Sequence, residues 1–176
     1  MSASRLEEIR QNRIQKLEKL RKLGIDPYPA KSSFDLVSVS QARKSPGKTV
    51  AAAGRLWRWR EHGNVIFADL RDSSGQIQLL FQNKILGNKF DLLKLFDVGD
   101  FIATQGEVTK TSAGEITIDV ASFELLSKSL RPLPDDWHGL KDVEERYRKR
   151  YLDLLLNLDI RRRFDVRTVV FKETRN

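Results

Sequence analysis

Residues 49–82 constrain the fold more than any other stretch of the chain. They read TVAAAGRLWRWREHGNVIFADLRDSSGQIQLLFQ, in which EHGN and DSSG supply the glycine and asparagine that tight hairpin turns need. Residues 65–71 and 76–82, on either side of the second turn, alternate between apolar and polar side chains. We therefore predict three consecutive antiparallel strands with one apolar face and one polar face.

The alternation assigns each side chain of these strands to a face. Phe67 falls on the polar face with Asp69 and Arg71, and Gln78 falls on the polar face of the third strand. An aromatic ring among polar side chains can stack an unpaired base while neighbouring amides read the base edge. Glu115 shares the polar face of the last strand, so a ring, an amide and a carboxylate could converge on one base. The alternative is that a loop simply covers Phe67.

A long amphipathic helix precedes the strands. Ser4 and Glu7 form a capping-box pattern at its start, apolar residues then recur at helical spacing, and Gly24 suits its C-terminal end. Its basic residues, including Arg10 and Arg13, form either a solvated face or an RNA-contacting one.

The remaining patterns complete a small barrel. They predict a short helix at 34–43, a helix at 84–97, and strands at 101–110 and 115–121, the last two joined by a turn at SAG. Five short strands with a helix between the third and fourth is the order of an OB-fold barrel, which binds oligonucleotides on the face of its second and third strands. The predicted class is thus mainly β with helices.

The pattern changes after the barrel. Residues 128–141 lack periodicity and contain two prolines and a glycine, which is typical of a linker, and two charged helical segments follow. The second segment reaches the end of the sequence without a cap, so we expect the chain to continue in a longer protein. The predicted domains are an N-terminal helical extension at 1–48, the OB-fold at 49–127, the linker at 128–141 and the start of a further domain at 142–176.

Composition excludes several classes of site. The chain has no cysteine and only two histidines, so it offers no disulfide, no cysteine nucleophile and no histidine–cysteine zinc site. No apolar run approaches the ~18 residues of a membrane span, and the charged N-terminus does not resemble a signal peptide. We therefore expect no metal, no membrane and a cytoplasmic location.

The net charge of +8 suggests a polyanionic partner. Residues 49–127, however, hold 8 Lys/Arg and 10 Asp/Glu, so the barrel itself is slightly acidic. The phosphate contacts of the barrel are then expected from a local cluster, Arg55, Arg58 and Arg60, which indicates recognition of a few nucleotides.

Three stretches resemble a known family. KLRKLGIDPYP at 19–29, the barrel pattern AGR…FADLRDSSGQIQ, and above all LRPLPDDWHGLKDVEERYRKRYLDL at 130–154 are similar to the N-terminal part of class II lysyl-tRNA synthetases. The barrel alone would also fit the aspartyl and asparaginyl relatives, and the segment at 130–154 favours the lysyl enzymes.

The resemblance implies roles for four residues. The stacking phenylalanine of the family, which holds the central uridine of the anticodon, falls on Phe67, and the glutamine that reads that base falls on Gln78. The anticodon-contacting arginine before the turn falls on Arg60, although the sequence leaves its facing open. A glutamate between the last two strands falls on Glu115.

Trp57 and Trp59 depart from the family, which usually has smaller or polar residues there. We expect them to pack in the core or at the rim, with extra stacking platforms as the alternative. We expect His62 to be an exposed turn residue.

The resemblance also implies what the longer protein does. Such enzymes join lysine to tRNA with ATP and Mg²⁺ through a lysyl-adenylate, and they are homodimers. Residues 159–176 look like the start of motif 1. Motifs 2 and 3, which hold ATP in the family, are missing, and because no glycine follows Gly139 the glycine-rich motif 3 cannot be hidden there. We therefore expect this chain to have no catalytic residue and no cofactor of its own, and only to bind the lysine tRNA.

Two alternatives remain open at this point. One is a stand-alone OB-fold module that binds single-stranded nucleic acid. The other is an aspartyl or asparaginyl relative of the lysyl enzymes, or a lysyl-synthetase-like domain fused to another activity.

Overall fold

The structure, a computed structural model, describes residues 3–111, 114–133 and 142–175. Parts of two predicted features, the turn at SAG and the linker at 128–141, lie outside the described residues. The chain divides into two compact units, Met1–Pro132 and Leu133–Asn176.

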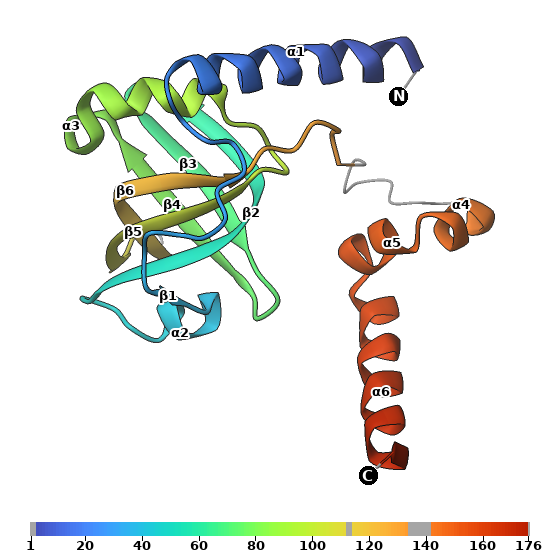
Figure 1. The fold of residues 1–176 in the computed structure, drawn as a ribbon. Helices are drawn as coiled ribbons and strands as arrows, with labels where there is room; N and C mark the ends of the chain where they lie inside the picture. The colour runs from blue at the N-terminus through green and yellow to red at the C-terminus, as the bar shows by residue number, and fades with distance from the viewer. Residues whose placement is uncertain (1–2, 112–113, 134–141, 176) are drawn as a thin grey trace. The chain divides into compact units, whose positions relative to one another are not determined.

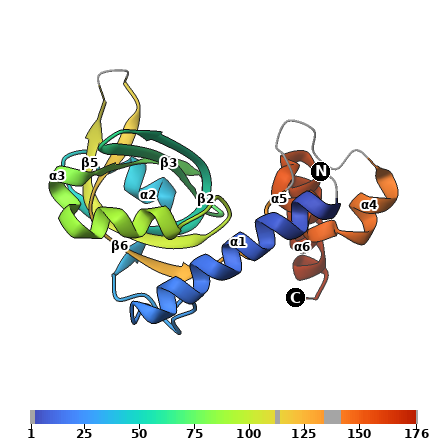
Figure 2. The same cartoon turned by 90° about the horizontal axis from the view of Figure 1, so that it is seen from above.

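The first unit is a closed barrel of five long strands (Figures 1 and 2). The strands run around it in the order β2-β3-β4-β6-β5 and back to β2; β4 and β6 are parallel, and the other pairs of the ring are antiparallel. The short strand β1 (Leu36–Val37) pairs in parallel with β2. The OB-fold prediction is confirmed. The five barrel strands are β2 (Thr49–His62), β3 (Val65–Arg71), β4 (Gln76–Gln82), β5 (Phe101–Lys110) and β6 (Ile116–Ser127).

Strand β2 closes the barrel because it pairs with two neighbours in succession. Its first half pairs with β5 and its second half with β3, and the register with β3 shifts between Leu56 and Arg58. Gly54 lies at the crossing of these pairings, where a Cβ atom would come within 2.6 Å of the carbonyl oxygen of Arg71. Only glycine permits this close approach of the two backbones.

The barrel interior is filled by the apolar face that the alternation predicts. Ile66, Ala68 and Leu70 of β3 are buried there, as are Leu79 and Phe81 of β4. The segment predicted as one helix at 84–97 closes one end of the barrel, but it consists of α3 (Asn83–Leu86) and a 3-10 helix, η1 (Gly87–Leu95). Gly87, with a φ of 53°, separates the two.

Helix α1 (Ala3–Lys22) lies at the same end of the barrel as η1, with Leu17 and Leu20 buried (Figure 1). It ends in a Schellman motif, because Gly24 N–H bonds the carbonyl of Arg21 and Ile25 N–H bonds that of Leu20. The predicted end at Gly24 is confirmed.

Two predictions about the N-terminal extension are wrong. The capping box is not used: Ser4 already lies inside the helix, and the Glu7 carboxylate accepts hydrogen bonds from Gln11 and Arg10. The helix predicted at 34–43 is only its second half, α2 (Val39–Arg43), because Leu36 and Val37 pair with β2 instead. Ser38 and Gln41 form a capping box at the start of α2.

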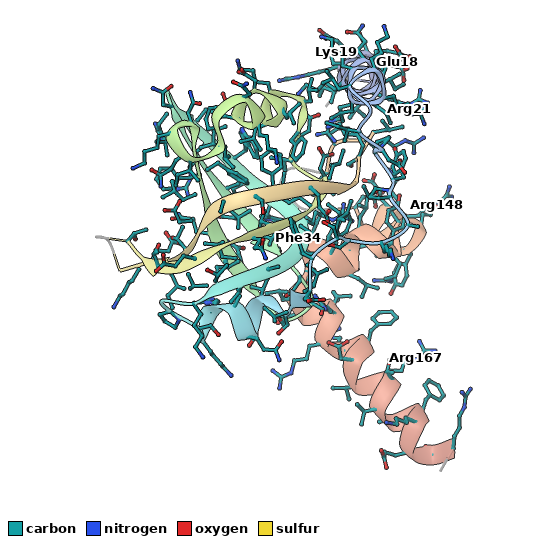
Figure 3. All side chains as sticks on the ribbon, turned by 60° about the vertical axis from the view of Figure 1, so that its left-hand side comes forward. Glu18, Lys19, Arg21, Phe34, Arg148 and Arg167 are labelled. Atoms are coloured by element: carbon teal, nitrogen blue, oxygen red, sulfur yellow. The ribbon has the colours of Figure 1, made fainter. Side chains whose placement is uncertain are left out.

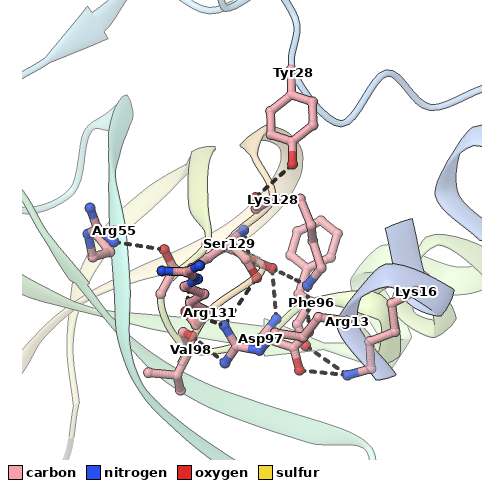
Figure 4. A network of polar contacts seen from close by, with 12 residues as sticks. Arg13, Lys16, Tyr28, Arg55, Phe96, Asp97, Val98, Lys128, Ser129 and Arg131 are labelled. Atoms are coloured by element: carbon pink, nitrogen blue, oxygen red, sulfur yellow. Dashed lines mark hydrogen bonds and ion pairs between the residues drawn. The ribbon is translucent and has the colours of Figure 1, made fainter. Parts of the chain in front are cut away.

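A buried group of charges joins α1 to the barrel (Figure 4). The ammonium of Lys128 lies 2.5 Å from Asp97 and 2.7 Å from Asp100, and its side chain is fully buried. Lys16 of α1 pairs with Asp97 at 2.7 Å. We call Lys16, Asp97, Asp100 and Lys128 the Lys128 cluster. It shows that the barrel's contacts continue past the predicted boundary at 127.

Burial acts on both carboxylates of the Lys128 cluster, with different results. Burial raises the pKa of Asp100 in spite of the opposing effect of Lys128. Burial also acts to raise the pKa of Asp97, but hydrogen bonds from Lys128 and Lys16 outweigh it, so the pKa of Asp97 lies below its usual value.

The described part of the second unit contains three helices, α4 (Val143–Arg148), α5 (Arg150–Leu156) and α6 (Leu158–Arg175). Asp142 caps α4 by accepting a hydrogen bond from the Glu144 N–H. The buried carboxylate of Asp153 pairs with Arg146 and Arg150 across the first two helices. The first predicted helical segment is thus two short helices that meet at Lys149.

Candidate nucleic-acid interface

Outward-facing side chains of β2, β3, β4 and β6 form cross-strand rows on the outer face of the barrel. Strand register aligns the members of each row, and successive rows lie two residues apart along β3 and β4; on β2 the register shift puts Arg58 three residues after Arg55. Two residues of a strand span about 7 Å. We name three rows: the arginine row (Arg55, Arg71, Gln76), the amide row (Arg58, Asp69, Gln78, Thr117) and the ring row (Arg60, Phe67, Leu80, Asp119).

The side-chain amide of Gln78 is held at both ends. Its Nε2 donates to Glu115 Oε2 at 2.9 Å, and its Oε1 accepts from Thr117 Oγ1 at 2.9 Å. An amide nitrogen has two N–H groups and an amide oxygen has two lone pairs, so one donor and one acceptor remain. Gln78 is only 7% exposed, and its orientation is therefore fixed before any ligand arrives.

Asp69 lies beside Gln78 in the amide row and is 3% exposed. It accepts a hydrogen bond from Gln76 and lies 3.9 and 4.0 Å from the guanidinium nitrogens of Arg58 and Arg60. Burial raises the pKa of Asp69, opposed by Arg60 and Arg58. Because both arginine side chains remain more than half exposed, Asp69 only partly neutralises them.

Phe67 is half-buried in the ring row, between Arg60 of β2 and Leu80 of β4. The ring of His62 meets it edge-on, with the centroids 6.3 Å apart. Phe67 thus lies on the polar face, as the alternation predicts, and outside the hydrophobic core cluster. His62 is exposed, as expected, but it also contacts the candidate stacking ring.

The register shift in β2 determines which residues face outward. Trp57 is the extra residue, so Arg58 and Arg60 align with Asp69 and Phe67. This shift is why parity could not assign the facing of Arg60. Trp59 faces inward and packs on the core, with its ring 6.0 Å from that of Phe81.

Trp57 is 9% exposed, and the guanidinium of Arg71 lies over its ring at 4.6 Å. Both tryptophans therefore take part in packing, which was the expected reading.

Glu115 lies just before β6, outside the three rows, and its side chain is exposed. Its backbone N–H bonds the hydroxyl of Thr111, and its carboxylate receives the Gln78 amide. Gln78 thus contacts Glu115, and Phe67 lies in the row next to that of Gln78.

The two candidate residues on α1 differ. Arg10 is exposed and pairs with Glu7 on the helix surface at 3.2 Å. Arg13 is 7% exposed, and its guanidinium donates to the carbonyls of Val98, Ser129 and Arg131 at 2.9 to 3.1 Å (Figure 4). Arg13 therefore lies on neither the solvated face nor the RNA-contacting face that the sequence left open, because it is buried and its guanidinium binds backbone carbonyls.

Other charged residues of α1 are exposed. Lys19 and Arg21 project from the helix into solvent, together with Glu18 (Figure 3). The exposed cations Lys19 and Arg21 are the better candidates for phosphate contacts on this helix.

Thr117 and Asp69 are site residues that the sequence did not single out. Thr117 orients Gln78, and its place on the polar face could have been found from its alternation with Ile116 and Ile118. Asp69 is surrounded by Arg58 and Arg60 of β2 and Gln76 of β4. Its burial depends on these contacts between strands, which the residues next to it in sequence do not predict.

Within the described part of the chain, no group of three or more His, Cys, Asp or Glu side chains is arranged to hold a metal ion. None of the described helices is both long and apolar enough to cross a membrane.

The comparisons with known proteins agree with this geometry. Residues 50–126 match the tRNA anti-codon family, described as an OB-fold nucleic acid binding domain. Lysine–tRNA ligase of Syntrophomonas wolfei subsp. wolfei is 46% identical over 100% of this chain and 37% of its own length. The lysine–tRNA ligase of Carboxydothermus hydrogenoformans is 42% identical over 99% of the chain and 37% of its own length.

The similarity to these ligases extends beyond the barrel into the second unit. A third relative, the lysine–tRNA ligase of a Thermoanaerobacter species, is 43% identical over 97% of this chain. The chain spans about a third of the length of these curated relatives. The barrel thus matches an OB-fold nucleic acid binding family, and the chain as a whole is similar to part of these lysine–tRNA ligases.

Proposed function

We propose that the outer face of β2, β3 and β4 binds the anticodon of a lysine tRNA and reads its central uridine. The observation that carries the proposal is the arrangement of Gln78 next to Phe67. Phe67 presents a half-buried ring, and Gln78, in the adjacent row, keeps one donor and one acceptor for a ligand.

The unused hydrogen-bond donor and acceptor of the Gln78 amide match the edge of uracil. A uracil edge offers an N–H donor beside a carbonyl acceptor, which pairs with the free acceptor and free donor of the amide. Stacking on Phe67 would supply sequence-independent affinity. Glu115 and Thr117 position the amide, and Arg60, Arg58 and Arg10 are proposed to contact phosphates.

The lysine–tRNA ligases to which the chain is similar support a role in attaching lysine to tRNA. For the enzyme that contains such a chain, we propose ATP and Mg²⁺ as cofactors, a homodimer as the assembly and the cytoplasm as the location. The match along the whole chain favours this reading over a stand-alone OB-fold module.

Direct binding tests the proposed recognition. The purified chain is titrated into labelled stem-loops that carry the lysine anticodon, or the same loop with the central uridine replaced by each other base. We expect the loop with uridine to bind most tightly. Equal affinity for all four loops would contradict the proposal.

We further propose that this chain alone does not activate lysine, because the sequence after Gly139 contains no glycine and so no glycine-rich ATP-binding segment. Lysine-dependent exchange of pyrophosphate into ATP measures activation. We expect none, and exchange that follows the purified chain through chromatography would contradict this expectation.

A further inference from the structure

The arginine row places two cations directly opposite each other. Arg55 of β2 and Arg71 of β3 are register partners on the outer face of the barrel, each partly exposed. Like charges at directly opposed positions of a sheet destabilise it. Such a pair therefore calls for a local explanation.

Each guanidinium is held in place by an uncharged group. Arg55 lies over the ring of Phe101, 4.3 Å from the centroid. It also donates to the carbonyl of Gly99 at 3.2 Å, the dashed line at Arg55 in Figure 4. Arg71 lies over the ring of Trp57 at 4.6 Å. Stacking on a ring fixes the plane of a guanidinium and leaves N–H groups at its edge for a ligand.

The two arginines also lack a counter-charge. Within residues 3–111, 114–133 and 142–175, neither guanidinium forms an ion pair with a carboxylate, whereas Arg58 and Arg60 in the next rows share Asp69. Burial lowers the pKa of Arg55, but an arginine still carries its charge at neutral pH. The arginine row is therefore a preorganised positive site without an anion.

We propose that Arg55 and Arg71 together bind one backbone phosphate of the RNA whose base stacks on Phe67. The inference rests on the proposed function and adds a site to it. Arg71 follows Phe67 by four residues on the same face of β3, about 13 Å along the strand. An OB-fold holds about 4 to 16 nucleotides, so the strand of RNA extends beyond the row of its stacked base. Paired guanidinium groups bind phosphate oxygens through bidentate, charge-assisted hydrogen bonds.

Removing both charges tests the site. The double variant Arg55→Gln/Arg71→Gln is compared with Lys84→Gln/Lys89→Gln, which removes two exposed charges from α3 and η1. We expect the arginine variant to bind the cognate stem-loop about tenfold more weakly and its salt dependence to fall by about 0.7 in the log–log slope, the share of one phosphate. The preference for uridine should not change, because a phosphate carries no sequence information. An unchanged salt slope would overturn the inference.

A charge-preserving variant separates binding from folding. Arg55→Lys/Arg71→Lys keeps both cations but loses the planar stacking, so it should keep the salt slope of the wild type. If the glutamine variant weakens binding only because its barrel is unfolded, its thermal transition will fall and the lysine variant will show the same loss of affinity. That pattern would overturn the inference.

Neutral phosphate substitutions locate the contact. Stem-loops with a single methylphosphonate at each loop position are titrated against the wild type and the glutamine variant. We expect one position at which the substitution weakens the wild type severalfold and leaves the variant unaffected. If every position weakens both proteins alike, the arginine row binds no phosphate, while uridine preference in the same titrations would leave the proposed function intact. Failure of the wild type to bind any loop would overturn both.

Discussion

The outer rows of the barrel and the Lys128 cluster both combine basic residues with aspartates, but they differ in how far the charges are buried and paired. In the Lys128 cluster, Lys128 is fully buried between Asp97 and Asp100, and beside it the donors of Arg13 are bound by backbone carbonyls. In the rows, Arg58 and Arg60 are more than half exposed and lie at the limit of ion-pair distance from Asp69. Lys128 and Arg13 thus have their partners within the protein, whereas Arg58 and Arg60 remain available to a ligand.

The largest expected effect is a loss of folding stability when Lys128 is removed from the Lys128 cluster. Lys128→Ala leaves the buried carboxylate of Asp100 without its cation, while Asp97 keeps its pair with Lys16, and breaking a buried ion pair from one side costs about 3 to 5 kcal/mol. Urea unfolding should show this loss, while Lys22→Ala, which removes an exposed charge from the end of α1, should change stability little. A loss below about 1 kcal/mol for Lys128→Ala would mean that water or a rearranged side chain replaces the ammonium. RNA affinity under folding conditions should stay at the wild-type level.

The second effect should be a loss of RNA affinity without a loss of folding stability. Phe67→Ala removes the proposed stacking surface and should weaken binding of the cognate stem-loop by about 1 to 3 kcal/mol. The melting temperature should change little, because the ring lies outside the core. Phe81→Ala, in the core, is the matched control and should lower stability strongly. A large drop in melting temperature for Phe67→Ala would make Phe67 a packing residue.

A smaller effect concerns the discrimination of bases. Gln78→Ala should weaken binding of the loop with central uridine more than binding of the substituted loops, by about 1 kcal/mol, the worth of one net hydrogen bond. Charge removal at Lys19 and Arg21 on α1 should instead weaken all loops alike and reduce the salt dependence. Equal weakening of all loops by Gln78→Ala would assign the amide to packing.

The smallest expected effect is a gain in RNA affinity when Asp69 loses its charge. Asp69→Asn keeps an acceptor for Gln76 but removes the charge that partly neutralises Arg58 and Arg60. Binding of all stem-loops should strengthen by a few tenths of a kcal/mol, the order of a surface ion pair, with a steeper salt dependence. The fold should not suffer, because burial raises the pKa of Asp69. At pH values above that pKa the ionised carboxylate lowers the stability of the folded state, and the neutral amide removes this cost. Weaker binding or a lost transition would contradict the role assigned to Asp69.

The sequence predicted the site best where the alternation of apolar and polar residues along a strand determines which face a side chain occupies. Alternation placed Phe67 and Gln78 on the polar face, and the turn residues placed the ends of β3 and β4 correctly. These features depend on residues a few positions apart, and strand geometry converts them into facing directly.

The sequence did not predict the environment of a side chain where that environment depends on contacts between residues far apart in the chain. Arg13 and Arg10 look alike on a helical wheel, yet only Arg13 meets the carbonyls of Val98 and residues 129–131. The facing of Arg60 depends on a bulge at Trp57 that β2 acquires by pairing with β3. The second anchor of Gln78, Thr117, comes from the parallel pairing of β4 with β6, which no local pattern specifies.

The most direct measurement is a titration of the isotope-labelled chain with the lysine anticodon stem-loop, followed by amide NMR. The central claim is that the outer rows meet the RNA and the Lys128 cluster does not. The side-chain NH₂ signals of Gln78 and the backbone signals of the ring and amide rows should shift on binding, while those of Asp97, Asp100 and Lys128 should stay in place. Shifts centred on the Lys128 cluster, with the Gln78 side chain unaffected, would contradict the claim.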